Sequence, residues 1–339
     1  MKSNIVRREE MKPTIYIASR SFGLFSQEAL ELVKSIAKIE RNPYGRTMNE
    51  KELLRIIGEI DGIVVGTDKI TRQIIESGSN LKIIAKHGVG LDNIDLKAAT
   101  ENDVVVIYAP HANAESVADL TIGLILSIAR RIPMAHFSTK QGKWEAPKFL
   151  GTEVYGKTLG IIGLGEIGYR VAKRAMGFNM RILAYDPYVS QERANEVSAR
   201  LVDLETVLKE ADFVTLHAQL TDKTRGIIGK KELSIMKKTA YLINTARGAL
   251  VDEKAFYEAL KNKEIAGAAL DVYSEEPPSE GFPLFKLDNI IVTPHIAAYT
   301  IEAMSRMDYT VAEDLARFFR GEKPLYIANP EVLQKIKLK

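Results

Sequence analysis

The sequence contains no cysteine, and this absence narrows the chemistry available to the protein. It excludes disulfides, thiolate catalysis and cysteine metal sites, and it fits a reducing compartment such as the cytoplasm. No His-x-x-x-His pair is present either, so we expect no metal site. The net charge is only +3, and basic residues are scattered among acidic ones. This balance argues against nucleic acid or a membrane surface as a partner.

Long apolar runs are also missing. The longest, residues 120–129, includes a glycine and a serine and is too short to span a bilayer. Residues 1–10 are polar and charged, unlike a signal peptide, and we expect residues 1–12 to form a disordered leader. With 339 residues, of which 46% are hydrophobic, the chain is long enough for two domains of ~100–200 residues each.

Strand-like and helical patterns alternate along the first third of the chain. Short apolar runs at 14–18, 62–65, 81–85 and 104–108 predict strands. Helical patterns separate them, one capped by Ser26, one over 50–60 and one starting at Asp95. Alternation of this kind implies right-handed crossovers and a parallel sheet, so we predict a first α/β lobe.

A long helical pattern over 113–131 follows, and Pro133 is expected to end it. Apolar side chains ring this segment nearly all round, which predicts a helix buried on both sides, between lobes or between subunits. The loop predicted over 136–151 holds the only tryptophan, Trp144. It is either an interface anchor or a cover for the second lobe.

The second lobe opens with a glycine fingerprint, Gly163, Gly165 and Gly168, between an apolar run at 159–162 and a helical pattern. In this arrangement the glycines permit a tight turn, close approach of a pyrophosphate and close helix–strand packing. The helix N-terminus favours the anion. Asp186 ends the next strand, about 20 residues on, where a carboxylate binds ribose hydroxyls and repels a 2′-phosphate. We therefore predict a Rossmann lobe that binds NAD rather than NADP.

Three polar side chains follow the later predicted strands of this lobe, at 241–244, 267–270 and 290–293. They are Arg247, Glu276 and His295. Ligands of open α/β sheets bind beyond the carboxyl ends of the strands, so we expect the three to meet beside the nicotinamide. Histidine can exchange a proton near neutral pH, a carboxylate can orient it, and arginine can fork onto a substrate carboxylate. Glu275 is an alternative partner for His295.

These segments together resemble the D-isomer-specific 2-hydroxyacid dehydrogenase family, nearest its phosphoglycerate dehydrogenases. The resemblance covers about residues 14–320. It is carried by the glycine fingerprint and by five further segments, residues 87–95, 113–121, 244–248, 271–277 and 294–298. It implies two doubly wound parallel-sheet lobes, a flavodoxin-like substrate lobe and a Rossmann NAD lobe, with the active site in a cleft between them. The expected domains are residues 1–109 with 301–339, and residues 110–300.

The resemblance also implies roles for individual residues. His295 would exchange the proton, Glu276 would pair with it, and Arg247 would hold the substrate carboxylate and carbonyl. The backbones of Val89 and Gly90 would bind the same carboxylate, and Lys86 would keep a positive charge nearby. Cofactor contacts are implied for the three glycines and for Glu166, Ile167, Asp186, Thr121, Thr245, Asp271 and Ala297.

One departure concerns the substrate. Phosphoglycerate-specific relatives commonly carry an arginine after the strand at 62–65, where this chain has Gly66. The expected reaction is NAD-dependent interconversion of a D-2-hydroxy acid and its 2-keto acid, with glyoxylate or hydroxypyruvate reduction as the alternative. A non-catalytic NAD-sensing co-regulator is the alternative from another class. We expect a homodimer, and no regulatory domain after residue 339.

Overall fold

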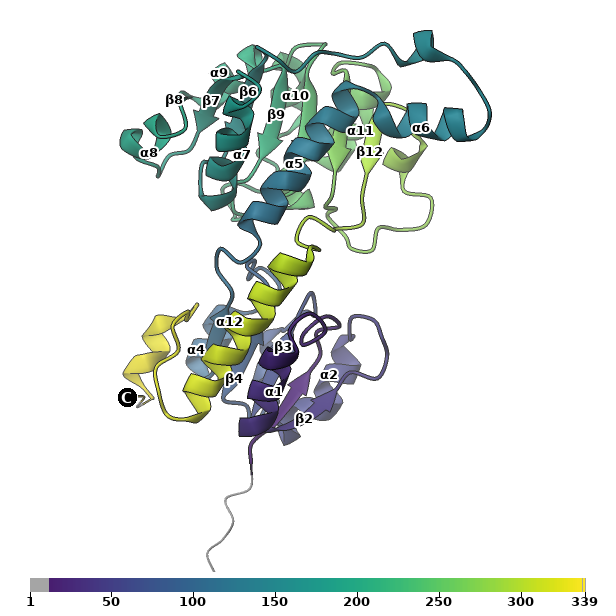
Figure 1. Cartoon of the computed structure of the whole chain (residues 1–339). Helices are drawn as coiled ribbons and strands as arrows, with labels where there is room; N and C mark the ends of the chain where they lie inside the picture. Colours follow the sequence, from purple (N-terminus) through teal and green to yellow (C-terminus); the bar gives the residue numbers. More distant parts are fainter. Residues whose placement is uncertain (1–11, 337, 339) are drawn as a thin grey trace, which may run out of the picture. The chain divides into compact units, whose positions relative to one another are not determined.

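The computed structural model describes residues 12–336 and residue 338, and it divides into two compact units (Figure 1). One unit takes the chain up to Asn113 and again from Thr300 onward, and the other is the continuous stretch Ala114–Tyr299. The leader predicted at residues 1–12 lies, apart from its last residue, outside the described residues. The cleft predicted between the lobes stays a prediction.

The first unit is built on a five-stranded sheet with the order β2-β1-β3-β4-β5. All its strands are parallel, and the order is that of flavodoxin-like doubly wound folds. The central strands are wholly buried because helices cover both faces, as their continuous apolar sequences require. The strands are β1 (Thr14–Ile17), β2 (Lys38–Arg41), β3 (Gly62–Val65), β4 (Ile83–Lys86) and β5 (Val105–Tyr108).

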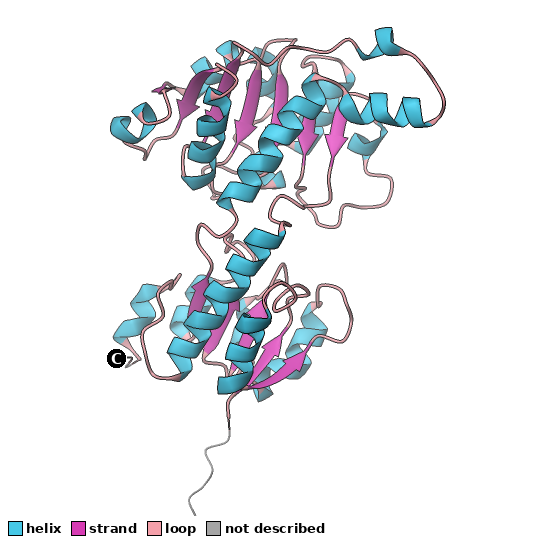
Figure 2. Ribbon diagram, viewed as in Figure 1, coloured by secondary structure: helices cyan, strands magenta, loops and turns pink. Residues whose placement is uncertain are grey.

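Helix α12 (Ile301–Phe319) returns from the second unit and packs beside α1 (Gln27–Ile36), as Figure 2 shows. Ser26 caps α1, as predicted, by accepting the N–H of Ala29. The other helices of this unit are α2 (Glu50–Ile56), α3 (Arg72–Glu76) and α4 (Leu96–Glu101). The helix predicted over 50–60 is shorter than expected, because it tightens into a 3₁₀ turn, η1 (Ile57–Glu59).

The second unit has a seven-stranded parallel sheet with the order β12-β11-β10-β9-β6-β7-β8. Six strands have the Rossmann order and β12 extends it at one edge, so the prediction of two parallel-sheet α/β lobes is confirmed. The strands are β6 (Thr158–Ile162), β7 (Arg181–Tyr185), β8 (Ala199–Leu201), β9 (Phe213–Leu216), β10 (Tyr241–Asn244), β11 (Gly267–Leu270) and β12 (Ile290–Val292).

Helices α5 (Ala114–Ala129) and α7 (Glu166–Met176) lie side by side on one face of this sheet (Figure 1). Helices α9 (Leu204–Glu210), α10 (Lys230–Ile235) and α11 (Glu253–Lys261) pack against one another in sequence. The short α8 (Gln191–Asn195) lies beside β8 at the sheet edge. Among the described residues, no helix is both long and apolar enough to cross a bilayer.

One prediction about the long helix needs correction. Pro133 does not end it, because the break comes at Arg131, whose φ of 53° is left-handed. Pro133 instead lies in the first turn of a new helix, α6 (Ile132–Lys140), where its missing N–H costs nothing. In the single chain Glu115, Asp119 and Gly123 of this helix are exposed, and burial between lobes or between subunits stays a prediction.

Candidate functional site

The glycine turn between β6 and α7 shows which glycines the protein itself requires. A Cβ on Gly163, whose φ is +94°, would lie 2.6 Å from the backbone nitrogen of Ala218. A Cβ on Gly168 would lie 2.1 Å from the carbonyl oxygen of Gly163. Both contacts are impossible for real side chains, so these two glycines serve the packing of β6, β9 and α7.

Gly165 differs from its neighbours, because a Cβ there would meet no described atom within 4 Å. It is the N-cap residue of α7 and has no side chain with which to cap this helix end. Packing therefore gives no reason for a glycine, whereas close approach of a diphosphate to the helix N-terminus does. The turn fits the diphosphate of a dinucleotide.

Asp186, just after β7, is half-buried and orders the loop beside this turn. Its Oδ2 accepts the N–H of Leu164 at 2.8 Å, and its Oδ1 accepts those of Tyr188 at 2.8 Å and Val189 at 3.2 Å. The carboxylate thus links the glycine turn to the loop after β7. This is where a Rossmann fold binds the adenosine ribose.

The end of β10 fixes the backbone of Arg247. The Asn244 side chain donates to the Arg247 carbonyl at 2.8 Å and accepts the N–H of Ala246 at 3.0 Å. The next residue, Gly248, must be a glycine, because a Cβ there would lie 2.0 Å from the carbonyl carbon of Tyr273. Arg247 is half-buried and donates from Nη1 to the Ala246 carbonyl at 2.7 Å.

His295 and Glu276 are brought together from the ends of β12 and β11. His295 Nδ1 lies 2.6 Å from Glu276 Oε2, while Glu276 Oε1 accepts the N–H of Tyr273 at 3.0 Å. Glu276, rather than the alternative Glu275, is therefore the partner. Burial raises the pKa of Glu276, but the hydrogen bond and charge of His295, helped by Tyr273 and Arg247, lower that pKa overall. The carboxylate is held ionised beside the imidazole.

Asp271 has a structural role that the sequence did not reveal. It is fully buried, and its Oδ1 accepts the Thr293 hydroxyl at 2.6 Å and the Ile296 N–H at 2.8 Å. Its Oδ2 accepts the N–H of Ala297 at 2.8 Å. These bonds brace the segment on which His295 adopts a left-handed φ of 55°. The predicted contact of Asp271 with the nicotinamide amide stays a prediction.

Two of the other predicted cofactor residues form a buried pair. Thr121 on α5 and Thr245 after β10 lie 2.9 Å apart between their hydroxyl oxygens. Thr121 also donates to the Val117 carbonyl one turn earlier in its helix, at 2.7 Å. The pair joins α5 to the sheet edge that carries Arg247. Ala297 is buried beyond His295.

The substrate residues predicted in the first unit lie at the end of β4. Lys86 is buried and donates to the Gly66 carbonyl and, at 2.7 Å, to Asn93 Oδ1. Val89 and Gly90 are half-buried in the turn that follows, which Gly88 opens with a φ of +156°. Their assignment to substrate stays a prediction.

Beside this turn lies a contact between residues far apart in sequence that sequence reasoning missed. His87 Nε2 is 3.0 Å from Asp308 Oδ1 on α12, with both side chains buried. Asp308 also accepts the N–H groups of Gly23 at 2.8 Å and Ser26 at 3.1 Å. Asp308 thus binds the loop after β1 to α12, and His87 lies against the same carboxylate.

Fold and site define a two-unit α/β protein whose second unit carries a dinucleotide-type turn, an imidazole–carboxylate pair and an arginine. No group of three or more metal-binding side chains occurs among the residues that the structure describes. Residues 122–297 match the family profile described as D-isomer specific 2-hydroxyacid dehydrogenase, NAD binding domain. The chain belongs to this family and carries its NAD-binding domain.

Individual relatives agree on the family and differ in the activity they are named for. D-3-phosphoglycerate dehydrogenase of Methanocaldococcus jannaschii is 47% identical over 91% of this chain and 59% of its own length. Glyoxylate reductase of Thermococcus litoralis is 40% identical over 95% of this chain and 98% of its own. The chain thus spans little more than half of the length of these phosphoglycerate dehydrogenases.

Among solved structures, D-lactate dehydrogenase of Aquifex aeolicus, complexed with NAD and lactic acid, is similar at a TM-score of 0.80. It is 27% identical, and the match covers 95% of this chain and 98% of that one. The similarity extends across both units.

Proposed function

We propose that the chain is an NAD-dependent oxidoreductase that interconverts a D-2-hydroxy acid and its 2-keto acid. The observation that carries this proposal is the 2.6 Å contact between His295 and Glu276. It lies in the unit whose glycine turn fits a dinucleotide. Arg247, Glu276 and His295 follow β10, β11 and β12, which are neighbours in the sheet, and ligands bind beyond such strand ends.

His295 is the proton donor during reduction of the keto acid and the proton acceptor during oxidation of the hydroxy acid. Glu276 holds Nδ1, so Nε2 is the nitrogen that exchanges the proton with the substrate oxygen. Arg247 binds the substrate carboxylate through its planar guanidinium. NAD, when bound, supplies the hydride chemistry, with its diphosphate at Gly163–Gly168 and its adenosine ribose at Asp186.

Replacement of His295 by Gln tests this mechanism. Turnover should fall by at least ~100-fold, the usual contribution of a general acid–base residue, with NADH affinity little changed. A matched control is Lys263→Gln, which removes an exposed charge at another positive-φ position of the same unit. Full turnover in the His295 variant would contradict the assignment of the proton donor.

For the substrate, we favour phosphoglycerate dehydrogenase activity because of the 47% identity to that enzyme of M. jannaschii. One observation favours reduction of glyoxylate or hydroxypyruvate instead. Gly66 takes the place of the expected arginine, and Lys86 already donates to Gly66 and Asn93. A panel of 2-keto acids with NADH decides, because only the first activity requires a much higher kcat/KM for phosphohydroxypyruvate than for hydroxypyruvate.

We further propose that the chain works as a homodimer through the segment that includes α6. This segment exposes four large apolar side chains, Ile132 at 51%, Phe137 at 66%, Trp144 at 89% and Leu150 at 84%. Trp144 therefore does not cover the second unit of its own chain. Large apolar side chains exposed close together in sequence suggest a protein interface. Light scattering should give the mass of two chains, and Trp144→Ser should weaken the dimer; a monomer mass for the unsubstituted chain would contradict this proposal.

A further inference from the structure

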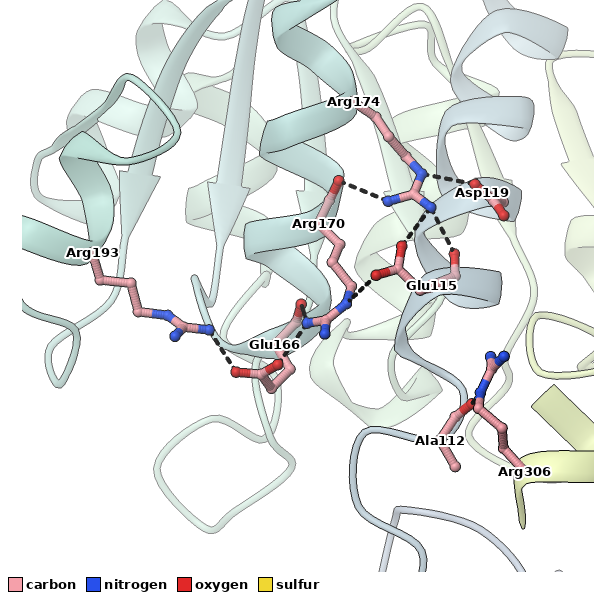
Figure 3. A network of polar contacts seen from close by, with 8 residues as sticks. All are labelled: Ala112, Glu115, Asp119, Glu166, Arg170, Arg174, Arg193 and Arg306. Atoms are coloured by element: carbon pink, nitrogen blue, oxygen red, sulfur yellow. Dashed lines mark hydrogen bonds and ion pairs between the residues drawn. The ribbon is translucent and has the colours of Figure 1, made fainter. Parts of the chain in front are cut away.

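Six charged side chains form a chain of alternating sign across one side of the second unit (Figure 3). Asp119 pairs with Arg174, Arg174 with Glu115, Glu115 with Arg170, Arg170 with Glu166, and Glu166 with Arg193. The first five lie on α5 and α7, which already pack together. Only the Glu166–Arg193 contact reaches α8, so the packing of α5 against α7 does not explain it.

The Glu166–Arg193 contact joins the two segments that the proposed function assigns to the cofactor. Glu166 is the first residue of α7, directly after Gly165. Arg193 belongs to α8, which follows the loop ordered by Asp186. Its Nη2 lies 2.6 Å from Glu166 Oε1. Asp186 bridges the same two segments through Leu164, so two carboxylates lie between the glycine turn and the loop after β7.

Arg193 is held where an exchange of partner is easy. Its guanidinium lies 4.8 Å above the ring of Tyr169, and both members of the ion pair keep 37% of their side chains exposed. Exposed ion pairs contribute little to stability, so this one can be broken at small cost. The hydrogen bond that Glu166 accepts from Arg170 lowers the pKa of Glu166 against the effect of burial. Arg193 lowers this pKa further, so the carboxylate stays ionised.

We propose that Glu166 determines specificity at the ribose 2′ position by binding Arg193. This rests on the proposed function, because it assumes that a dinucleotide occupies the turn. A 2′-phosphate arriving near Asp186 meets two carboxylates, and the nearby guanidinium is already paired with one of them. Arginine is the side chain best suited to bind a phosphate in a bidentate way. Glu166 thus reinforces the preference for NAD that Asp186 begins.

The test is titration of the unsubstituted protein and three variants with NADH and NADPH, followed by cofactor fluorescence. Glu166→Gln should improve NADPH affinity relative to NADH by about five-fold, the scale of one exposed charge pair. Glu166→Gln with Arg193→Gln should lose that gain. Arg181→Gln is the matched control, because it breaks a similarly exposed ion pair, with Glu210, at the opposite end of β7. It should leave the ratio of affinities unchanged.

Three results would overturn the inference. One is an unchanged NADPH-to-NADH ratio in Glu166→Gln, and another is a gain that persists in the double variant, since that would reflect only the lost negative charge. The third is an equal change in the Arg181 control. Failure of the unsubstituted protein to bind either cofactor would reject the proposed function itself, and is distinguishable from all three.

Discussion

The Asp271 carboxylate accepts the backbone N–H of Ala297 at 2.8 Å, from a fully buried position beneath the segment that carries His295. Asp271, which has no assigned proton-transfer role, thus holds the backbone two residues after His295, the residue that has one. The Thr293 hydroxyl and the Ile296 N–H, on either side of His295, donate to the same carboxylate. The position of the imidazole therefore depends on Asp271 as well as on Glu276.

Asp271→Asn should loosen this segment while keeping the size of the side chain. An amide has one acceptor oxygen in place of two, so at least one buried N–H loses its partner, at a cost of about 1–3 kcal/mol in unfolding free energy. We expect a larger fall in kcat than in NADH affinity. Denaturation with urea and steady-state kinetics check both effects, and an unchanged kcat would show that the brace does not position His295.

Gly165→Ala should separate folding from cofactor binding. No described atom lies within 4 Å of the added methyl group, so the melting temperature should change little. The methyl group nevertheless faces the predicted diphosphate, and NADH affinity should fall by about ten-fold or more. Gly123→Ala, which also meets no described atom within 4 Å, is the matched control and should retain full NADH affinity. Equal NADH binding in both variants would contradict the diphosphate assignment.

The Glu276–His295 contact should make stability depend on pH on the acid side. The pKa of Glu276 is lowered in the folded protein. The full contribution of the pair to the free energy of unfolding is therefore present only at pH values above the ordinary glutamate pKa of about 4.3. That contribution is lost as the pH falls through the lowered value. The difference in unfolding free energy between the unsubstituted protein and Glu276→Gln should therefore shrink below about pH 4. A difference that stayed constant down to pH 3 would reject this contribution.

His217, at the end of β9, should remain neutral throughout the physiological range. Burial lowers its pKa from the ordinary value of 6.5 to about 3. Because the unfolded chain binds this proton more readily, stability falls as the pH drops from about 6.5 toward 3. His217→Gln should flatten that part of the unfolding profile, whereas His136→Gln, at an exposed histidine of the same unit, should not. An NMR titration showing His217 protonated at pH 6 would contradict the prediction.

Much of the fold could be predicted from short-range patterns. Four strands of the second unit, β6, β9, β10 and β11, begin within one residue of the predicted positions and end where expected, because each is an apolar run between turn residues. The edge strands β2 and β8 were missed. Their sequences, Lys-Ile-Glu-Arg and Ala-Arg-Leu, are partly charged because the outer side of an edge strand faces water.

The features of the candidate site also divide into those that local sequence patterns predict and those that they do not. Gly165, Arg247, Glu276 and His295 could be found because they follow predicted strands, and strand ends collect at one edge of a parallel sheet. The contacts of Asp271 with Ala297 and of His87 with Asp308 could not. Asp271 was recognised as a polar residue at a strand end, but which backbone groups it would meet depends on the path of a distant loop. Asp308 carries no local signal at all within its helix.

The division of the chain into an interrupted unit and a continuous one has a consequence for biosynthesis. Helix α12, which supplies Asp308 and covers the first sheet, emerges from the ribosome after the whole of Ala114–Tyr299. Domains generally fold as they are made. The dinucleotide-type unit can therefore complete its core during translation, while the sheet begun first still lacks the helix that packs beside α1.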